Sequence, residues 1–566
     1  MSKWKRWKIK ELPSRDQVEK LRKEMNISPI EAVLLLQRNI MDANEAHAYF
    51  NPTLNILHDP FLMKGMEKAV DRIKKAKENN EKILVYGDYD VDGTTAVSIM
   101  YKYLREIFSE IYFYVPDRFN EGYGISAEGI DFAKNHLVSL IIALDCGIKE
   151  NEMVNYANSF GIDMIICDHH NPGQNIPDAY AILNPKQTDC NYPYKELSGC
   201  GIGFKLIQAC ENQFETGFDI FELVDYVAVS IASDIVPMTG ENRTLAFIGL
   251  ERLNSLPSIP FKAMLSNLKI NKTLDINDLV FVIGPRLNAS GRISHALTTV
   301  EFLIAPNIAS ANNYFELINS NNVERQDIDL HTLEDAVKLV EQNPSLQKKK
   351  TTVLFNPHWH KGVIGIVASR LMDHYYRPTV LLTESEGVLA GSARSVAGFD
   401  LYNALEHCRD LLDKFGGHQF AAGLTLQQHN FNAFQKRFEE VVSATITDEM
   451  LTPLIEYDLE LKQEHIELKL TDIVDKFAPF GPENMKPKFV LKHLKNIEEV
   501  KIVGNNHLRI VLNINNQRIA CVGFGLGDYY HELKKGREFD ICFTAEKNHW
   551  NGKIYLQLNL KDIHFN

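Results

Sequence analysis

Three apolar runs in the first third of the chain each end at side chains that can bind a metal ion. Ile83 to Tyr86 leads into the acidic segment Gly87 to Gly93, Leu140 to Leu144 leads into Asp145, and Met164 to Cys167 leads into Asp168, His169 and His170. In an open parallel sheet, groups that follow successive strands converge on one crevice at the carboxyl ends of the strands. Carboxylates held this close repel one another unless a bound cation supplies compensating charge. The runs therefore predict a parallel α/β sheet with a metal site at one edge.

The acidic segment carries Asp88, Asp90 and Asp92 at alternate positions, which copies the start of an EF-hand calcium loop. The twelfth loop position would be Ile99, where a bidentate glutamate is needed, and a strand rather than a helix precedes the segment. Calcium sensing is therefore excluded. A solvated acidic turn is the simpler alternative, because Asp and Gly favour turns. That alternative weakens once Asp145 and the Asp-His-His motif end neighbouring strands.

Oxygen ligands combined with imidazoles suit Mn²⁺ or Mg²⁺ better than a structural zinc ion. Carboxylates from separate strands can bridge two such ions about 3.5–4 Å apart, an arrangement that promotes in-line displacement at phosphorus. Of the two adjacent histidines, one could be a ligand while the other reaches the substrate. Asp234, in an apolar segment before Pro237, is either a helix-ending acid or a further ligand, and residue chemistry alone favours neither.

The length and composition are those of a multidomain globular protein. With 566 residues, the chain is too long for one core, and about 150 residues per domain gives three or four domains. Hydrophobic residues make up 45%, charged residues make up 24%, and no run of about 18 apolar residues could cross a membrane. The basic N-terminus meets Glu11 and Asp16 where a signal peptide needs apolar residues, so we expect a cytoplasmic location.

Charge and cysteine content narrow the function further. A net charge of −13 argues against a broadly basic surface for nucleic acid. It still permits a local basic groove, because the acids of a metal site count in the total. The eight cysteines form no Cys-x-x-Cys pair, so we expect buried fillers rather than a zinc knuckle or a disulfide framework.

The order of strand-like and helix-like segments divides the chain into five parts. Apolar runs alternate with helix-length segments between 81 and 185, which is typical of βαβ units, and a second such pattern begins at Thr351. A long helical pattern at 308–343 lies between them, and period-two alternation after about 450 favours a small β-barrel. We expect a helical lead-in at 1–80, an α/β domain at 81–305, a connecting helix at 306–350, a second α/β domain at 351–448 and a barrel at 449–566.

Three glycine-rich segments, 284–292, 391–395 and 415–423, carry arginine, serine or histidine. Small residues let backbone amides approach an anion closely, and a forked guanidinium can hold phosphate. We interpret the three segments as loops that could bind phosphate. Solvated arginines are the alternative explanation for 284–292, and tight-turn chemistry is the alternative for the other two segments.

Together these motifs resemble the RecJ family of the DHH phosphoesterase superfamily, over nearly the whole chain. The DHH motifs correspond to the acids at 88–92, Asp145-Cys146-Gly147, Asp168-His169-His170 and Asp234-Ile235-Val236-Pro237 followed by Glu241-Asn242-Arg243. The linker and the DHH-associated domain correspond to 284–292, 360–370, 391–395 and 416–423. The combination is highly specific, whereas any one motif is not.

The resemblance implies a role for each matching residue. It implies metal ligands at Asp88, Asp90, Asp92, Asp145, His169 and Asp234. It implies that His170 lies beside the scissile phosphate and that Asp168 orients the histidine pair. It also implies substrate binding by Arg118, Arg286, Asn288, Arg292, Ser392, Arg394, Gly416, Gly417 and His418.

The chain departs from the family pattern at two places. Many relatives have a histidine at the position of Tyr86, so we expect Asp88 to take over that ligand role. The segment Phe480 to Pro487 is looser than the Gly-Asn-Pro form usual in relatives. The second departure concerns the part of the barrel that would face the 5′ end of the strand, and it does not involve the predicted metal ligands.

What the resemblance implies is a metal-dependent 5′→3′ exonuclease, which degrades single-stranded DNA to 5′-mononucleotides in repair and recombination with two Mn²⁺ or Mg²⁺ ions. The implied fold is two α/β domains joined by a long helix, plus an OB-like β-barrel. Trp550 and Tyr555 are candidates to stack on bases there, unless they belong to the barrel core. The implied partners are single-stranded DNA, a single-strand-binding protein and a RecQ-type helicase, with no membrane, for a monomeric enzyme.

A phosphodiesterase for short substrates and a non-enzymatic scaffold are the two alternatives to an exonuclease. A phosphodiesterase acting on short oligonucleotides or cyclic dinucleotides would not need the C-terminal barrel, and it stays as the alternative hypothesis. A non-enzymatic replication scaffold built on a decayed core would have lost metal ligands. This chain keeps its acids and its histidine pair, which argues against the scaffold.

Overall fold

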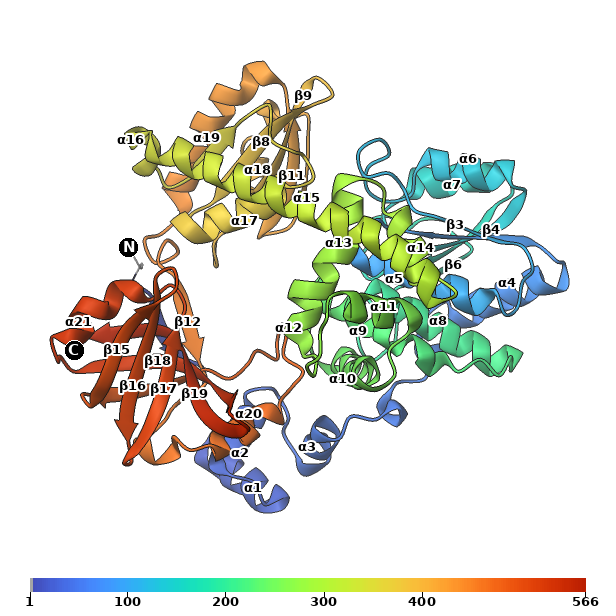
Figure 1. The fold of residues 1–566 in the computed structure, drawn as a ribbon. Helices are drawn as coiled ribbons and strands as arrows, with labels where there is room; N and C mark the ends of the chain where they lie inside the picture. Colours follow the sequence, from blue (N-terminus) through green and yellow to red (C-terminus); the bar gives the residue numbers. More distant parts are fainter. Residues whose placement is uncertain (1–3, 566) are drawn as a thin grey trace. The chain divides into compact units, whose positions relative to one another are not determined.

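The computed structural model describes residues 4–565, and the chain divides into two compact units (Figure 1). The central unit comprises Arg38–Val323 and Lys476–Lys486. The flanking unit comprises Met1–Gln37, Glu324–Asp475 and Pro487–Asn566. Both units are discontinuous in sequence, because a short segment from near the C-terminus completes the central unit and the N-terminal segment completes the flanking unit.

The central unit is built around the predicted parallel sheet. Its strands run in the order β3-β2-β4-β5-β6, and every neighbouring pair is parallel. They are β2 (Lys82–Gly87), β3 (Ile111–Tyr114), β4 (Val138–Leu144), β5 (Asp163–Cys167) and β6 (Ala181–Leu183). Because β2, β4 and β5 are adjacent, the predicted metal ligands that follow them leave the same edge of the sheet.

Helices cover both faces of this sheet, since alternate residues of each strand pack into two separate cores. Ile83 and Val85 of β2 belong to the larger core, whereas Leu84 and Tyr86 belong to the smaller one. The helices of this unit are α3 (Ala43–Phe50), α4 (Met66–Glu78), α5 (Val91–Leu104), α6 (Ala127–Asn135), α7 (Asn151–Ser159), α8 (Gly199–Phe214), α9 (Val224–Asp234), α10 (Gly240–Ser255), α11 (Ile259–Asn267), α12 (Ile276–Asp278), α13 (Gly284–Ile293) and α14 (Leu297–Leu303). Burial on both faces explains why the strands are continuous apolar runs.

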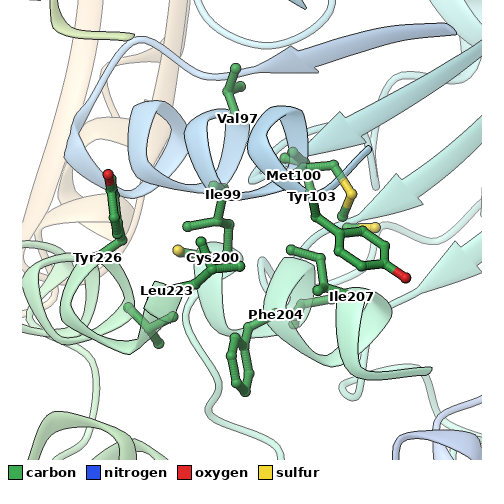
Figure 2. Close-up of a cluster of buried hydrophobic side chains, with 14 of the residues drawn as sticks. Val97, Ile99, Met100, Tyr103, Cys200, Phe204, Ile207, Leu223 and Tyr226 are labelled. Carbon is green, nitrogen blue, oxygen red and sulfur yellow. The ribbon is translucent and has the colours of Figure 1, made fainter. Parts of the chain in front are cut away.

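The larger core fixes the helix that follows the acidic segment. Figure 2 shows Ile99 and Tyr103 of α5 beside Cys200 and Ile207 of α8. All four of these side chains are fully buried, and burying a large apolar side chain contributes about 1.5–3 kcal/mol. The N-terminus of α5, which carries two of the predicted ligands, is therefore held rigidly against α8.

The segment 284–292, interpreted from sequence as a loop, is instead the helix α13. A π-helical turn, η4 (Leu279–Ile283), runs directly into it, and Pro285 is tolerated in a first helical turn. Its glycines serve close packing. A Cβ atom on Gly284 would lie 2.6 Å from Ser233 Oγ, and one on Gly291 would lie 2.7 Å from Tyr89 O. The sequence pattern could not show these neighbours, so the two glycines were interpreted as the ends of a loop.

A single long helix, α15 (Ile308–Glu341), matches the predicted helical pattern at 308–343. The division between the two units falls inside this helix, between Val323 and Glu324. Its second half therefore belongs to the flanking unit, where Asp329 is buried.

The flanking unit contains the second predicted α/β pattern, which forms a five-stranded sheet of order β10-β11-β9-β8-β7. The strands are β7 (Thr352–Phe355), β8 (Thr379–Ser385), β9 (Val388–Arg394), β10 (Lys414–Gly417) and β11 (Ala421–Leu426). The helices are α16 (Pro344–Gln347), α17 (Ile364–Tyr375), α18 (Leu401–Glu406) and α19 (Phe431–Thr445). The glycine-rich segments 391–395 and 415–423, expected as loops, lie mostly on β9 and on the β10–β11 hairpin.

The period-two runs near the C-terminus form the expected strands. Seven strands pair in the order β13-β14-β18-β19-β17-β16-β15. They are β13 (Leu459–Glu460), β14 (Phe489–Leu494), β15 (Ile497–Val503), β16 (His507–Ile514), β17 (Gln517–Gly523), β18 (Phe539–Trp550) and β19 (Lys553–Phe565), with the helices α20 (Lys469–Asp475) and α21 (Tyr530–Lys534) beside them. Within residues 4–565 the end strands β13 and β15 do not pair, so the strands expected to form an OB-like β-barrel make a sheet that is not closed.

The expected helical lead-in also contains a strand. Two helices, α1 (Arg15–Met25) and α2 (Pro29–Leu36), follow β1 (Arg6–Ile9), which pairs in parallel with β12 (Leu454–Tyr457). The Trp7 indole N–H also donates to the buried Asp562 carboxylate at 2.9 Å. The first strand thus belongs with the C-terminal part of the chain, and its partners lie more than 400 positions away in the sequence.

The structure bears on the expectations about membrane-spanning segments and about cysteines. Within residues 4–565, none of the helices is both long enough and apolar enough to cross a membrane. All eight cysteines are buried and free, as expected for small apolar fillers.

Candidate metal centre

The carboxyl ends of β2, β4 and β5 bring the predicted ligands into one cluster. Potential ligand atoms within 4.8 Å of one another form three overlapping groups, namely Asp88–Asp90–Asp145, Asp92–His169–Asp234 and Asp145–His169–His170. All six ligands proposed from the sequence are in these groups. Asp234, whose role the sequence left open, is the last residue of α9 and faces the cluster.

His169 lies where the three groups meet. Its Nε2 atom is 3.2 Å from Asp145 Oδ1, 3.5 Å from Asp234 Oδ2 and 3.8 Å from Asp92 Oδ2. The imidazole is 8% exposed, and the Asp92 and Asp145 residues are 1% and 2% exposed. His169 Nε2 therefore lies among three carboxylates at a site that is almost fully shielded from solvent.

The backbone at this site is shaped for close approach. Asp145 has a φ of 60°, a left-handed conformation that costs a non-glycine residue about 1 kcal/mol or more. A Cβ atom on Gly199 would lie 2.6 Å from Asp145 Cβ, and one on Gly93 would lie 2.3 Å from Asp88 O. Glycine at both positions lets the helices α8 and α5 begin directly against the acids.

Asp92 is held by the N-terminus of α8. One carboxylate oxygen accepts the Gly199 N–H at 2.6 Å, and the other accepts the Cys200 N–H at 2.7 Å and the Ser230 hydroxyl at 2.7 Å. Backbone donors at a helix N-terminus stabilise negative charge. Asp90 has a local role as well, because it caps α5 by accepting the Gly93 N–H at 3.1 Å.

Burial and mutual repulsion both disfavour charge on these acids. Burial raises the pKa of Asp88, Asp145 and Asp234 well above the ordinary value for an aspartate, and the neighbouring aspartates raise it further. The pKa of Asp90 is raised for the same two reasons. Burial lowers the pKa of His169, so its ring is held neutral. Deprotonated acids beside a neutral imidazole are the states that bind a divalent cation.

Hydrogen bonding tests whether a cation fits this cluster. Among residues 4–565, Asp88 Oδ1, Asp145 Oδ1 and His169 Nε2 are buried and make no hydrogen bond. An unpartnered buried polar atom costs about 1–3 kcal/mol, and three in one cluster call for a common partner. All three atoms can donate a lone pair and two of them are carboxylate oxygens, so a divalent cation can serve as the partner of all three. The donor set of carboxylates and one imidazole fits Mn²⁺ or Mg²⁺.

The second histidine has a different environment. Asp168 accepts from His170 Nδ1 at 2.7 Å, and its other oxygen accepts the buried Ile148 N–H at 2.9 Å. Burial alone would raise the pKa of Asp168, but the hydrogen bonds from His170 outweigh it and lower the pKa to about 2. Burial would lower the pKa of His170, and the bond to Asp168 raises it instead. Asp168 therefore fixes the orientation of the His170 ring, with Nε2 directed away from it.

Tyr123, which was not predicted from the sequence, lies beside the His170 ring. The Tyr123 hydroxyl lies 3.2 Å from His170 Nε2, and the Tyr123 side chain is half exposed. Its only signal in the sequence is its position between two glycines, Gly122 and Gly124, which both have positive φ. A loop tyrosine of this kind cannot be recognised without the fold.

Four of the residues predicted to bind substrate lie in the central unit. The Arg118 guanidinium stacks over the Tyr89 ring, 4.7 Å from its centroid. Arg286 donates to Val282 O at 2.7 Å, and Asn288 has a buried Oδ1 with no hydrogen bond among the described residues. Arg292 is on the same helix, α13, which packs against the acidic segment at Tyr89. Arg118 and α13 thus both adjoin the segment that carries the first three acids.

The other five predicted residues lie in the flanking unit. Ser392 and Arg394 are on β9, and the Arg394 guanidinium donates to Ser392 Oγ at 2.9 Å. Gly416, Gly417 and His418 belong to the β10–β11 hairpin. Gly417 has a φ of 149°, and a Cβ atom there would lie 2.3 Å from Ala421 O, so this turn requires glycine. The hairpin pairs with β9, which brings the five residues onto one sheet.

Comparison with known proteins agrees with this architecture. Three domain families match, described as the DHH family N-terminal domain at residues 82–231, the DHHA1 domain at 348–444 and the RecJ OB domain at 457–562. The parallel sheet, with every acid of the cluster except Asp234, lies in the first match. The fold and the site therefore define a phosphoesterase of the DHH family.

Individual relatives narrow this class. The single-stranded-DNA-specific exonuclease RecJ of Bacillus subtilis (strain 168) is 37% identical, over 98% of this chain and 70% of the relative. The exonuclease of the same name from Escherichia coli (strain K12) is 32% identical, over 88% of this chain and 90% of the relative. The crystal structure of RecJ in complex with Mn²⁺ from Thermus thermophilus matches with a TM-score of 0.85 at 25% identity, covering 99% of this chain and 80% of that one. The chain belongs to the RecJ family of single-stranded-DNA-specific exonucleases.

Proposed function

We propose that this chain is a metal-dependent exonuclease that degrades single-stranded DNA in the 5′→3′ direction and releases 5′-mononucleotides, in DNA repair and recombination. The observation that carries the proposal is the set of three buried atoms without hydrogen bonds, Asp88 Oδ1, Asp145 Oδ1 and His169 Nε2, at the meeting point of the strands. The specificity named for the relatives supports the choice of substrate.

The proposed ligands are Asp88, Asp90, Asp92, Asp145, His169 and Asp234. Mn²⁺ or Mg²⁺ bound there as two ions would supply the Lewis acidity that activates water and stabilises charge on the departing oxygen. The fixed carboxylate of Asp92 and the capping carboxylate of Asp90 are pre-organised by the backbone donors described above. Tyr86, which stands where many relatives have histidine, is buried, and its hydroxyl donates to Gly124 O at 3.0 Å. This contact supports Asp88 as the ligand in its place.

His170 is proposed to lie beside the scissile phosphate, with Asp168 as the group that orients it. Because Nδ1 is engaged by Asp168, Nε2 is the ring atom that can donate to a phosphate oxygen or exchange a proton. Tyr123 shares this nitrogen and can return to it when no phosphate is present.

The proposed substrate-binding residues fall into two sets. Arg118, Arg286, Asn288 and Arg292 would bind the strand next to the acids, because they adjoin the acidic segment or lie on α13. Ser392, Arg394, Gly416, Gly417 and His418 would bind phosphate through the second α/β domain. Forked guanidinium donors and glycine amides suit this role.

The remaining parts of the proposal rest on the family resemblance and on the sequence. From the resemblance we propose a monomeric enzyme, with a single-strand-binding protein and a RecQ-type helicase as partners. From the segment pattern and the N-terminal residues we propose the domain division at 1–80, 81–305, 306–350, 351–448 and 449–566 and a cytoplasmic location.

The test is digestion of a single strand labelled at either end. With Mn²⁺ or Mg²⁺, we expect label at the 5′ end to be released first, as mononucleotide, and EDTA to stop the reaction. An Asp145→Asn variant should lose at least about a thousandfold in rate while binding the strand within a few-fold of wild type, since it removes a ligand and not a phosphate contact.

A matched control is Asp71→Asn, which changes an exposed acid on α4 and should leave the rate unchanged. Earlier release of label from the 3′ end would overturn the polarity, and an active Asp145→Asn variant would overturn the shared-metal site. Faster cleavage of dinucleotides or cyclic dinucleotides than of long strands would favour the alternative phosphodiesterase.

A further inference from the structure

The Arg394 guanidinium of the flanking unit has an unusual set of neighbours. It is partly buried beside α17, and no carboxylate of residues 4–565 lies within ion-pair distance of it. Burial lowers the pKa of Arg394, and no acid offsets that effect. A desolvated cation without an acid is costly unless an anion arrives from outside the protein. Under the proposed function, that anion is a substrate phosphate.

The donors of this guanidinium are divided between protein and solvent. The Nε–H group donates to Ser369 Oγ at 3.0 Å. Nη1 donates to Ser392 Oγ at 2.9 Å and to Ala393 O at 2.8 Å. Three of the five N–H groups are thereby used, and the two on Nη2 remain for a ligand. A Cβ atom on Gly365 would lie 3.0 Å from Nη2, so glycine at that position keeps this edge of the guanidinium from being crowded.

Ser369 is itself fixed in one orientation. It lies on α17, and its hydroxyl donates to Gly365 O, one turn earlier, at 3.2 Å. That bond commits the hydroxyl hydrogen and leaves an oxygen lone pair facing Arg394. The next residue, Arg370, pairs at 3.0 Å with the buried carboxylate of Asp329 on α15. The hydroxyl thus sits on a helix that is anchored to its neighbour.

We infer that Ser369 is a positioning residue for substrate binding, which holds the plane of the Arg394 guanidinium so that its Nη2 donors face a substrate phosphate. The inference rests on the proposed function and adds to it a residue outside the set predicted from sequence. An arginine loses much rotamer freedom when it binds a phosphate, and a guanidinium already held by its Nε–H loses less. The gain is in affinity, because the contact is the same before and during the reaction.

The first experiment measures steady-state digestion of single-stranded DNA by Ser369→Ala, Ser369→Thr and wild type. We expect alanine to raise KM about tenfold with kcat within about twofold of wild type, and threonine to recover KM to within about threefold because it keeps the hydroxyl. The matched control is Ser255→Ala on α10, whose hydroxyl makes the same kind of bond to a carbonyl one turn earlier, Glu251 O at 2.7 Å, without contacting an arginine. That variant should behave as wild type.

The second experiment asks whether Ser369 acts through Arg394. In an Arg394→Gln background, which itself should raise KM and reduce the salt dependence of log KM by about 0.7, the further change Ser369→Ala should have no effect. A merely structural serine would raise KM by the same factor in both backgrounds.

Three outcomes would overturn the inference. They are an unchanged KM in Ser369→Ala, equal defects in Ser369→Ala and Ser369→Thr, and additive effects of the Ser369 and Arg394 changes. Each of these outcomes is a KM comparison, so it can be measured only if the wild-type protein digests single-stranded DNA. A wild-type protein that does not release nucleotides with Mn²⁺ or Mg²⁺ would instead contradict the proposed function, so the two failures are distinguishable.

Discussion

Individual buried charges in the central unit are of two kinds. Some have a partner of opposite sign, as where Arg72 meets Glu81 at 2.7 Å and Asp163 at 2.6 Å. The acids of the metal centre instead face one another around His169. Such an arrangement destabilises the metal-free fold, and it is retained where a bound cation removes the repulsion. The unfavourable electrostatics are therefore the clearest functional signal at the scale of a residue.

Lys102 on α5 is a half-buried charge that has no ion-pair partner among residues 4–565. Its ammonium donates to the Tyr226 hydroxyl at 3.1 Å, and burial lowers its pKa, although Asp225 and Glu222 offset part of that effect. Because Tyr226 keeps its own bond to Leu303 O at 2.8 Å, we expect Lys102→Met to raise the free energy of unfolding by about 1 kcal/mol at pH 7.

This gain should depend on pH in a defined direction. With a folded-state pKa below the unfolded value of about 10.4, the unfolded state binds more protons, so wild-type stability rises between the two pKa values. The advantage of Lys102→Met is then largest below the folded pKa and disappears near pH 10.4. Denaturant titrations of both proteins at pH 7 and pH 10 measure it. A constant difference across this range would contradict the buried-charge explanation.

At the scale of elements, the metal centre depends on the first turn of α8. Gly199 donates its N–H to Asp92, and a Cβ atom there would lie 2.6 Å from Asp145 Cβ and 2.7 Å from Asp145 Oδ1. We expect Gly199→Ala to lower nuclease activity by about a hundredfold and stability by about 1–3 kcal/mol, because the methyl group must displace a ligand. Initial rates and thermal unfolding check both values.

The control for this change is another glycine of the same unit. A Cβ atom on Gly173 would meet nothing closer than Asn175 O at 3.6 Å, so Gly173→Ala should be neutral. Wild-type activity in Gly199→Ala would mean that Asp145 does not need the position seen here.

Elements that depend on local pattern were predictable from the sequence, and those that depend on distant partners were not. The strands β2, β4 and β5 end in ligands because burial on both faces gives a continuous apolar run and the acids mark its end. The strand β1 was missed because its partner β12 lies more than 400 residues away. The helix α13 was missed because its glycines report close packing, which looks like turn chemistry in a sequence.

The same distinction applies within the site. Residue chemistry left the role of Asp234 open, and only the family resemblance implied a ligand there, since it comes from α9 and not from a strand end. Tyr123 and Ser369 act on His170 and Arg394 through single hydrogen bonds, and nothing in their sequence context marks those contacts. The family motifs thus predicted the candidate ligands and the orienting role of Asp168, while the contacts of Tyr123 and Ser369 could not be predicted from the sequence.

At the scale of the whole molecule, we expect the OB domain, matched at residues 457–562, to favour long single strands over short substrates. Trp550 and Tyr555 lie on the β18–β19 hairpin and are 67% and 49% exposed, so they are not core residues. Stacking a base on an aromatic ring contributes about 1–3 kcal/mol. We expect Trp550→Ala to raise KM for a long single strand about tenfold and to leave dinucleotide cleavage unchanged.

Trp550→Phe, which keeps a ring, should restore most of the affinity. Equal losses on both substrates would indicate that the ring stabilises the fold and does not bind DNA. Substitution is preferable to truncation here, because β1 and Trp7 contact β12 and Asp562 and would lose these partners in a C-terminal deletion.

The central claim is that the acids and His169 share divalent cations, and anomalous diffraction from crystals grown with Mn²⁺ tests it most directly. The account predicts two peaks about 3.5–4 Å apart, within bonding distance of the ligands Asp88, Asp90, Asp92, Asp145, His169 and Asp234. The absence of manganese density between these side chains would contradict it.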